Sequence, residues 1–330
     1  MVTTINPELQ ISDCVNPDDI AVEKAVTGGV TTIHTLPGSG TNLAGFSVIV
    51  KLDRSEPTKM ILRELGAMKI AQAFNPERRG GDLGGTRMGM SWMLRQILKQ
   101  GKQYSDSWRD YEEGRSKEKP KLKPELELMR KVFDGEVPTI VHTYSPWGVM
   151  QTMRMFNDEN KLHVIPTHTA YGGYMVGKEA AKRPDVHINI GPRVEEFSRP
   201  TYDGQFHAMG AEYHKAGVEN LSINTDSVGW SSYIAPIEEL SFQASMSAHL
   251  GLDEMAALKA ITINSARALG IEDKVGSLEV GKDADIVVKE GSLLDNTTPV
   301  DVVLINGKIV YSRKGVDLVV KKQAAPAGKD

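Results

Sequence analysis

The sequence predicts an α/β protein whose core is a parallel β-sheet. Seven short apolar runs rich in β-branched residues have the character of strands, and helical patterns fit between several of them. Several runs are almost continuously apolar, which is typical of parallel strands buried on both faces. The predicted strands span 30–36, 46–52, 67–71, 137–144, 162–168, 186–192 and 221–227.

The strand count bears on the architecture. A closed barrel of alternating strands and helices needs eight parallel strands. No run before residue 30 has the character of a strand, because residues 1–15 are polar and irregular. We therefore expect a (β/α)8 TIM-type barrel whose first strand is absent from this chain. An open doubly wound sheet is the alternative, since seven strands suit it as well.

Helix boundaries are predicted by capping residues. Asn16 before Pro17 indicates a helix start, and the glycine at position 28 indicates its end. Asp253 is expected to open a helix that runs to about Leu269 and stops at Gly270. A further helix is predicted over 87–98, followed by a solvated excursion over 99–124. One buried helix face is predicted from the i, i+4, i+7 spacing of Val149, Met153 and Phe156.

The pattern changes after Gly270 to turns and short strands. Asn306-Gly307 between two apolar runs predicts a hairpin with a type I′ turn. We therefore expect two units, a barrel over 1–271 and a small, incomplete β-sandwich module with a tail over 272–330.

Composition limits the possible partners. The formal net charge is −4 and the sequence pI is about 6.1, which argues against nucleic acid or an anionic membrane as the main partner. No apolar run is long enough to be a transmembrane helix. The single cysteine, Cys14, allows no intrachain disulfide and favours a reducing compartment, so we expect a cytoplasmic protein.

Three polar side chains are predicted to share one rim of the sheet. His142, His168 and Asp226 lie at or near the ends of three separate strands, and the ends of parallel strands meet at one edge. Two imidazoles and a carboxylate suit a Zn²⁺-type site. For any one of them, a polar residue at a strand end with ordinary hydrogen bonds is the alternative. His34 also lies near a strand end and remains open as a ligand.

Lys69 lies within a short apolar strand, where a free ammonium is costly to bury. It needs a partner, a shifted pKa or a covalent modification. A CO₂-modified lysine that bridges two metal ions would meet this need, and a salt bridge to a nearby acid would meet it equally well. Lys51 is a weaker candidate for the same role. The glycine-rich segment 37–45 lacks the pattern of a phosphate-binding loop and is expected to form a tight loop on the rim.

Several segments resemble the amidohydrolase superfamily. Residues 260–270 (AITINSARALG) and 275–287 (VGSLEVGKDADIV) closely resemble its C-terminal signature, and 306–311 (NGKIVY) matches its final hairpin. Residues 29–33 (GVTTI) resemble its second barrel strand, and 68–76 (MKIAQAFNP) resemble the imidazolonepropionase-like branch.

This resemblance implies specific ligands. Family metal ligands follow strands five, six and eight, which correspond to His142, His168 and Asp226. The carboxylated lysine of strand four, found in members with two metal ions, corresponds to Lys69. The family also carries a His-x-His pair on strand one, and no His-x-His occurs in this chain. The resemblance therefore leaves three readings: a fragment, a partner polypeptide that carries the missing part, or a lost site.

The implied activity is metal-dependent hydrolysis of C–N bonds in small cyclic amide or peptide-like substrates, with one or two divalent ions, zinc foremost. Asp226 would move the proton from water to the leaving nitrogen. Tyr144, Tyr171 and Arg193 follow strand ends and are candidates for substrate contacts, with packing at the rim as the alternative. A homo-oligomer is compatible with the resemblance. The competing function is a non-catalytic amidohydrolase-like protein, or one subunit of a split enzyme.

Overall fold

The computed structural model describes residues 4–73, 75–79, 83–192, 195–197, 206–227 and 236–314. Its centre is a six-stranded sheet in the order β11-β8-β7-β6-β5-β2, in which β5, β6, β7, β8 and β11 run parallel. β2 (Leu43–Phe46) pairs antiparallel with β5 at one edge. The parallel strands are β5 (Met68–Ala71), β6 (Thr139–Thr143), β7 (Val164–His168), β8 (Ile188–Ile190) and β11 (Leu221–Ile223). The predicted α/β class is confirmed, and five predicted strands lie in this sheet.

The first two predicted strands lie elsewhere. The runs at 30–36 and 46–52 contain β1 (Thr32–Thr35) and β3 (Val48–Lys51), which pair antiparallel. β4 (Ile61–Arg63) adds a third strand to this separate sheet. The expectation of parallel core strands was wrong here, because apolar β-branched runs identify strands but not their partners. Within the described ranges the central sheet is open, ending at β2 and β11, so the predicted TIM-type barrel without its first strand is not closed there.

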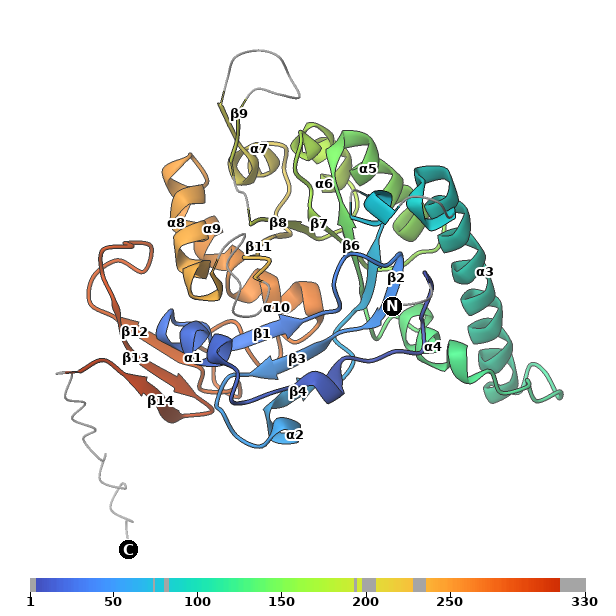
Figure 1. The fold of residues 1–330 in the computed structure, drawn as a ribbon, viewed down its shortest axis with the longest axis horizontal. Helices are drawn as coiled ribbons and strands as arrows, with labels where there is room; N and C mark the ends of the chain where they lie inside the picture. The colour runs from blue at the N-terminus through green and yellow to red at the C-terminus, as the bar shows by residue number, and fades with distance from the viewer. Residues whose placement is uncertain are drawn as a thin grey trace, which may run out of the picture.

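The helices wrap round the central sheet, from α3 and α4 at one side through α5, α6 and α7 to α8, α9 and α10 at the other (Figure 1). None of the described helices is long and apolar enough to cross a bilayer. The α-helices are α1 (Ile20–Thr27), α2 (Pro57–Met60), α3 (Arg87–Glu112), α4 (Glu127–Phe133), α5 (Ser145–Thr152), α6 (Gly177–Ala181), α7 (Met209–Lys215), α8 (Leu240–His249), α9 (Glu254–Ala260) and α10 (Ile263–Leu269).

Shorter elements connect these. A π-helical turn, Met153–Asp158, continues α5. The 3-10 turns are η1 (Ser12–Cys14), η2 (Pro76–Arg79), η3 (Leu83–Gly85), η4 (Pro124–Leu126), η6 (Gly173–Val176) and η7 (Ile237–Glu239). β9 (Glu195–Phe197) and β10 (Phe206–Ala208) form a two-stranded ribbon.

Helix boundaries differ from the predictions in three places. α1 begins at Ile20, because the Asp19 carboxylate accepts from the Ala21 N–H at 2.8 Å and caps the helix later than Asn16 would. α3 continues to Glu112 rather than ending near residue 98, because its buried face extends to Tyr104 and Ser105. The helix capped by Asp253 is divided into α9 and α10, although Gly270 ends α10 with φ of 65° as predicted.

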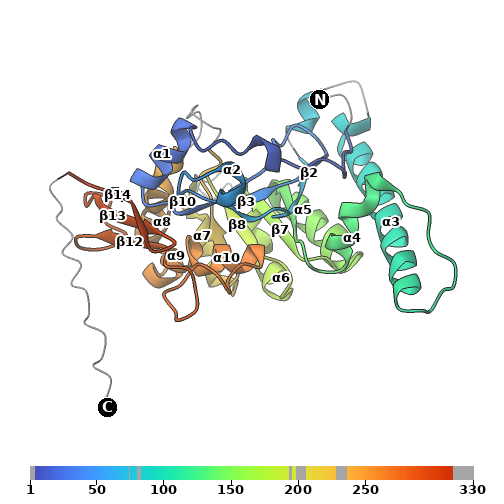
Figure 2. The same ribbon diagram turned by 90° about the horizontal axis from the view of Figure 1, so that it is seen from below.

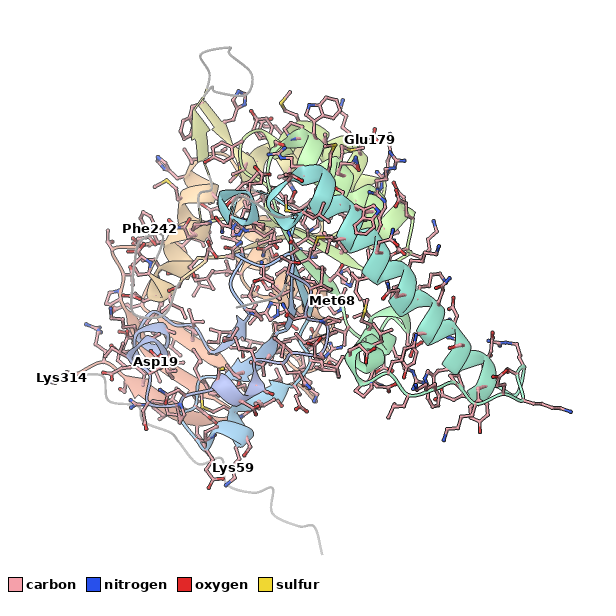
Figure 3. All side chains as sticks on the ribbon, turned by 45° about the vertical axis from the view of Figure 1, so that its right-hand side comes forward. Asp19, Lys59, Met68, Glu179, Phe242 and Lys314 are labelled. Carbon is pink, nitrogen blue, oxygen red and sulfur yellow. The ribbon has the colours of Figure 1, made fainter. Side chains whose placement is uncertain are left out.

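The largest apolar core lies between the central sheet and the helices. Val149, Met153 and Phe156 are each fully buried in it, which confirms the predicted core face. Met68 at the start of β5 is also fully buried, and Figure 3 shows it in the interior of the molecule. This core fixes the strands whose ends carry the predicted ligands.

The C-terminal strands form a separate sheet that packs against the N-terminal segment. β12 (Ile286–Lys289), β13 (Val300–Ile305) and β14 (Lys308–Ser312) form an antiparallel sheet. Asn306 and Gly307 have φ of 52° and 73°, as the predicted type I′ turn requires. Figures 1 and 2 both show α1 beside this sheet, and one apolar cluster joins α1 and β3 to β13. The division at residue 271 stays a prediction.

Candidate metal centre

Two of the predicted ligands meet at the ends of β6 and β7. The parallel register places His142 opposite Thr167, and Thr143 opposite His168. The imidazole rings of His142 and His168 lie 4.6 Å apart between centroids and cross at 77°. Both residues are buried, with exposed fractions of 2% and 4%. The structure thus brings together two nitrogen ligands that are 26 residues apart in the chain.

Among the residues that the structure describes, neither ring nitrogen of His142 has a hydrogen-bond partner, although both atoms are buried. An unsatisfied buried polar group costs about 1–3 kcal/mol, so its retention needs a reason. Burial lowers the pKa of His142, and the nearby His168 and Lys69 lower it further, so the ring is neutral. A neutral imidazole with a free lone pair is the form that binds a metal ion.

His168 is held in a defined orientation. Its Nδ1 lies 2.7 Å from the Gly191 carbonyl oxygen, and because a carbonyl only accepts, Nδ1 carries the proton. Nε2 then presents a lone pair, as in metal-binding histidines whose other nitrogen donates to a carbonyl. Burial lowers the pKa of His168, while Asp226 and the bond to Gly191 oppose the shift. A Cβ on Gly191 would meet the Asn224 oxygen at 2.1 Å, so only glycine fits there.

Lys69 lies in the interior beside this pair, with an exposed fraction of 1%. Its Nζ donates to the Ser39 hydroxyl at 2.9 Å and to the Ile70 carbonyl at 3.4 Å. Burial lowers the pKa of Lys69 to about 8, and the attraction of Asp226 opposes this shift. The glycine-rich loop, through Ser39, therefore contacts the predicted bridging lysine.

Asp226 follows β11, is half-buried and has a left-handed backbone with φ of 47°. Its carboxylate acts on both Lys69 and His168 through longer-range attraction. In the described part of the chain, however, no three His, Cys, Asp or Glu side chains converge closely enough to hold a metal ion. The structure therefore shows a close histidine pair, with the carboxylate further away.

Two predicted substrate-contact residues surround the histidine pair. The Tyr144 ring stacks on His168 at 5.7 Å and 17°, and meets His142 edge-on at 4.9 Å. The Tyr171 ring lies 5.5 Å from that of Tyr144. Both tyrosines thus border the candidate site. Arg193 lies outside the described residues.

The two weaker candidates have other partners. His34 Nε2 is 2.5 Å from the Ser47 hydroxyl, which is bonded in turn to the backbone of Ala67. Burial, with smaller effects of Lys69 and Arg63, lowers the pKa of His34 to about 3. His34 is therefore tied to the neighbouring strands.

The prediction of Lys51 as a second candidate for the CO₂-modified lysine was wrong, because its ammonium is fully paired. Lys51 Nζ donates to Asp283 at 2.7 Å, to Asp285 at 3.1 Å and to Asn306 at 2.5 Å. These partners all lie in the C-terminal module, so Lys51 fastens β3 to that module.

Sequence reasoning missed Gly191, whose carbonyl oxygen orients His168. The available signal was Gly191-Pro192 directly after an apolar run, which marks a special backbone position. Gly191 has φ of 118°, a conformation that other residues avoid.

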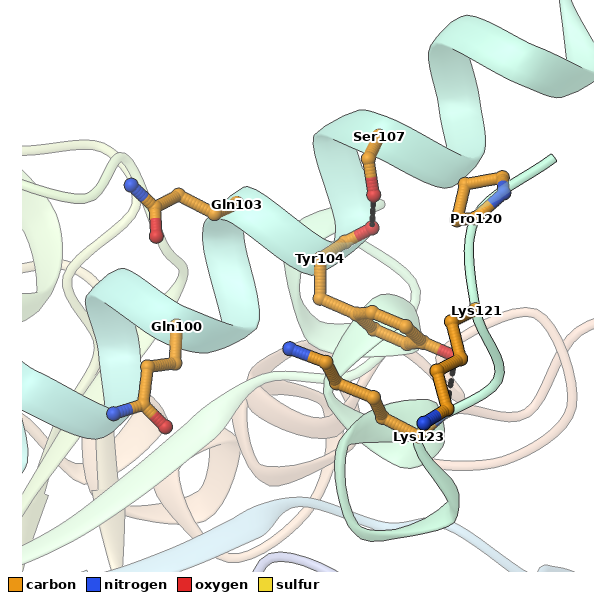
Figure 4. A pocket seen from close by; sticks show the side chains of 7 residues that line it. All are labelled: Gln100, Gln103, Tyr104, Ser107, Pro120, Lys121 and Lys123. Atoms are coloured by element: carbon orange, nitrogen blue, oxygen red, sulfur yellow. Dashed lines mark hydrogen bonds between the residues drawn. The ribbon is translucent and has the colours of Figure 1, made fainter. Parts of the chain in front are cut away.

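A surface pocket elsewhere contains none of the predicted ligands. It lies between α3 and the segment that follows it (Figure 4). Its lining consists of Gln100, Gln103, Tyr104, Ser107, Pro120, Lys121 and Lys123. The chemistry of these side chains does not suit a metal ion, so the histidine pair remains the candidate site.

Comparisons with known proteins agree with the fold described above. Residues 204–310 match the model of the amidohydrolase family. The crystal structure of an amidohydrolase from Thermotoga maritima is 27% identical and superposes with a TM-score of 0.81, covering 94% of this chain and 80% of that one. Residues 204–310 therefore match the amidohydrolase family, and the predicted resemblance to it is confirmed.

Two curated relatives match shorter segments of the chain. A 5-methylthioadenosine/S-adenosylhomocysteine deaminase from Thermoanaerobacter pseudethanolicus is 33% identical over 32% of this chain and 29% of its own length. An imidazolonepropionase from Fusobacterium nucleatum is 30% identical over 33% of this chain and 27% of its own length. The matched segments thus span less than a third of either relative.

Proposed function

We propose that this chain hydrolyses C–N bonds in small cyclic amide or peptide-like molecules, using one or two divalent metal ions, with zinc the first candidate. The observation that carries the proposal is the buried His142 ring beside the oriented His168; within the described part of the chain, its two nitrogens lack partners. The relatives named as a deaminase and an imidazolonepropionase support this reaction class.

The donor set fits such a metal ion. His142 and His168 supply neutral imidazole nitrogens and Asp226 a carboxylate, which are ligand types that zinc accepts. When bound there, a divalent ion lowers the pKa of a water molecule and polarises the scissile carbonyl.

Side chains of this protein carry out the proton transfer and hold the substrate. Asp226 accepts a proton from the attacking water and passes it to the leaving nitrogen. Tyr144 and Tyr171 border the site and contact the substrate, and Arg193 is a third candidate for this role. Positioning of the substrate against the histidine pair lowers the entropic part of the barrier.

Lys69 is proposed to carry a CO₂ modification. With a pKa of about 8, Lys69 is a neutral amine in about a tenth of the molecules at pH 7. The amine nitrogen attacks CO₂, a new C–N bond forms and one proton leaves to solvent. The resulting carbamate replaces a buried cation by an anion whose oxygen atoms suit metal ligation.

The experiment is a hydrolysis screen of zinc-reconstituted protein against cyclic amides and dipeptides. We expect turnover that stops on chelation, returns with zinc and falls at least about 100-fold in Asp226→Asn. Protein that takes up no zinc on reconstitution and shows no turnover would overturn the proposal. That result would favour a non-catalytic amidohydrolase-like chain or one subunit of a split enzyme, an alternative that the unassembled third ligand supports.

A further inference from the structure

Two loops meet at the rim of the candidate site. The Ser145 N–H donates to the Ala170 carbonyl at 2.8 Å, and the Thr169 N–H donates to the Thr143 carbonyl at 3.2 Å. These bonds join the start of α5 to the loop that follows β7. Side chains that leave the two loops near this junction therefore share one neighbourhood.

Three large apolar side chains near the junction are exposed to solvent. Trp147 is 79% exposed, Tyr171 is 52% exposed and Met175 is 53% exposed. We name these three residues the apolar shelf. Trp147 belongs to α5, and Met175 belongs to η6, which packs against α5. Contiguous exposed apolar surface is uncommon and typically marks a binding site.

One residue of the apolar shelf, Tyr171, links it to the histidine pair through Tyr144. The Tyr171 ring lies 5.5 Å from the Tyr144 ring, and Tyr144 stacks on His168. A row of rings therefore leads from solvent to the imidazole that is oriented for ligation. A molecule whose amide lies at the histidine pair would reach Tyr171 with its adjoining substituent.

The backbone of both loops is held in costly conformations. Ser145, His168, Thr169 and Tyr171 have φ of 66°, 71°, 53° and 57°, in the left-handed region that favours glycine. Residues with a Cβ are disfavoured in this region, because the Cβ comes close to the following carbonyl oxygen. Strain of this kind clusters at functional sites, where the direction of the side chains matters. Two of the four carry rings of the row described above.

We propose that the apolar shelf binds an aromatic or extended apolar substituent of the substrate and so selects apolar over charged amides. This inference rests on the proposed function for the position of the reacting amide. The apolar shelf itself consists of uncharged side chains, and its binding step needs neither metal nor turnover.

The test measures binding to the metal-stripped full chain by isothermal titration calorimetry. The probes are N-acetyl-phenylalaninamide, N-acetyl-glycinamide and N-acetyl-aspartamide. We expect the phenylalanine probe to bind about tenfold more tightly than the other two, since one aromatic contact is worth about that factor. Equal affinities for the three probes would overturn the inference.

Variants locate the binding surface. Tyr171→Ala and Trp147→Ala should each reduce the preference to about threefold or less, while Tyr171→Phe keeps it. Phe242→Ala is the matched control, because Phe242 is an exposed aromatic on α8 with an exposed fraction of 40%. An equal loss in Phe242→Ala would overturn the inference. Lack of hydrolysis with the preference intact would fault the proposed function alone.

Discussion

Replacing Lys51 tests how the C-terminal module is attached to the remainder of the chain. Lys51 is 4% exposed, and its ammonium lies between Asp283 and Asp285. The Asp285 side chain is only 6% exposed, whereas that of Asp283 is 38% exposed. Lys51→Met keeps the length of the apolar stem and removes the charge, so Asp285 is left buried without its cation.

The magnitude follows from this burial. Removal of one partner from a buried ion pair destabilises a protein by about 3–5 kcal/mol, because the other charge stays uncompensated. The contribution of Asp283 is discounted, since water screens its exposed carboxylate. We therefore expect Lys51→Met to lower the free energy of unfolding by about 3 kcal/mol. In Lys51→Met with Asp285→Asn, at least about half of this loss should return, since no buried charge remains.

The assay is urea unfolding followed by circular dichroism, with Lys59→Met as control. Lys59 forms an ion pair with Glu56 whose side chains are 66% and 70% exposed, so its loss should cost less than about 1 kcal/mol. Equal losses in Lys51→Met and Lys59→Met would refute the reasoning. We also expect unchanged zinc content in Lys51→Met, because the ion pairs of Lys51 with Asp283 and Asp285 lie apart from the histidine pair.

Three further changes have defined outcomes. In metal-free protein, His142→Leu should raise the free energy of unfolding by about 1 kcal/mol, because it removes two unsatisfied buried nitrogens; a loss above about 2 kcal/mol in urea unfolding would contradict this. Burial and the neighbouring His163 lower the pKa of His187 to about 3. Between about pH 6.5 and pH 3 the unfolded chain carries a proton on His187 that the folded chain does not. The contribution of His187 to the free energy of unfolding is therefore complete above about pH 6.5 and falls towards pH 3 by up to about 1.4 kcal/mol per pH unit. His187→Gln should remove that part of the slope, and an unchanged slope between pH 7 and 5 would speak against it. Gly191→Ala should abolish zinc binding, because its Cβ meets the Asn224 backbone; zinc content measured by mass spectrometry tests this, and wild-type content would contradict it.

Strand-forming segments were predictable because their side chains are locally distinctive. The continuous apolar character of β5, β6 and β7 reflects burial on both faces, and the histidines at the ends of β6 and β7 followed directly from that prediction. Because these strands are parallel, their order places His142 and His168 on one edge of the sheet. Asn306-Gly307 was equally predictable, because its turn type depends on two neighbouring residues.

The pairing of strands that are distant in the chain was harder to predict from the sequence. The run at 46–52 spans a break at Ser47, where the chain passes from β2 in the central sheet to β3 in the other. Apolar pattern is the same on both sides of this break, so it could not indicate two sheets. The role of Lys51 was hidden for a similar reason, since its partners lie more than 230 residues later in the chain.

The central claim is that His142, His168 and Asp226 hold a metal ion. The direct measurement is the zinc content of the full chain after equilibrium dialysis and inductively coupled plasma mass spectrometry. We expect about one or two zinc ions per chain in the wild type and a loss of at least one in His142→Ala, His168→Ala and Asp226→Ala. His214→Ala, a change at an exposed residue of α7, should keep the wild-type content. Zinc content that is the same in all five proteins would contradict the claim.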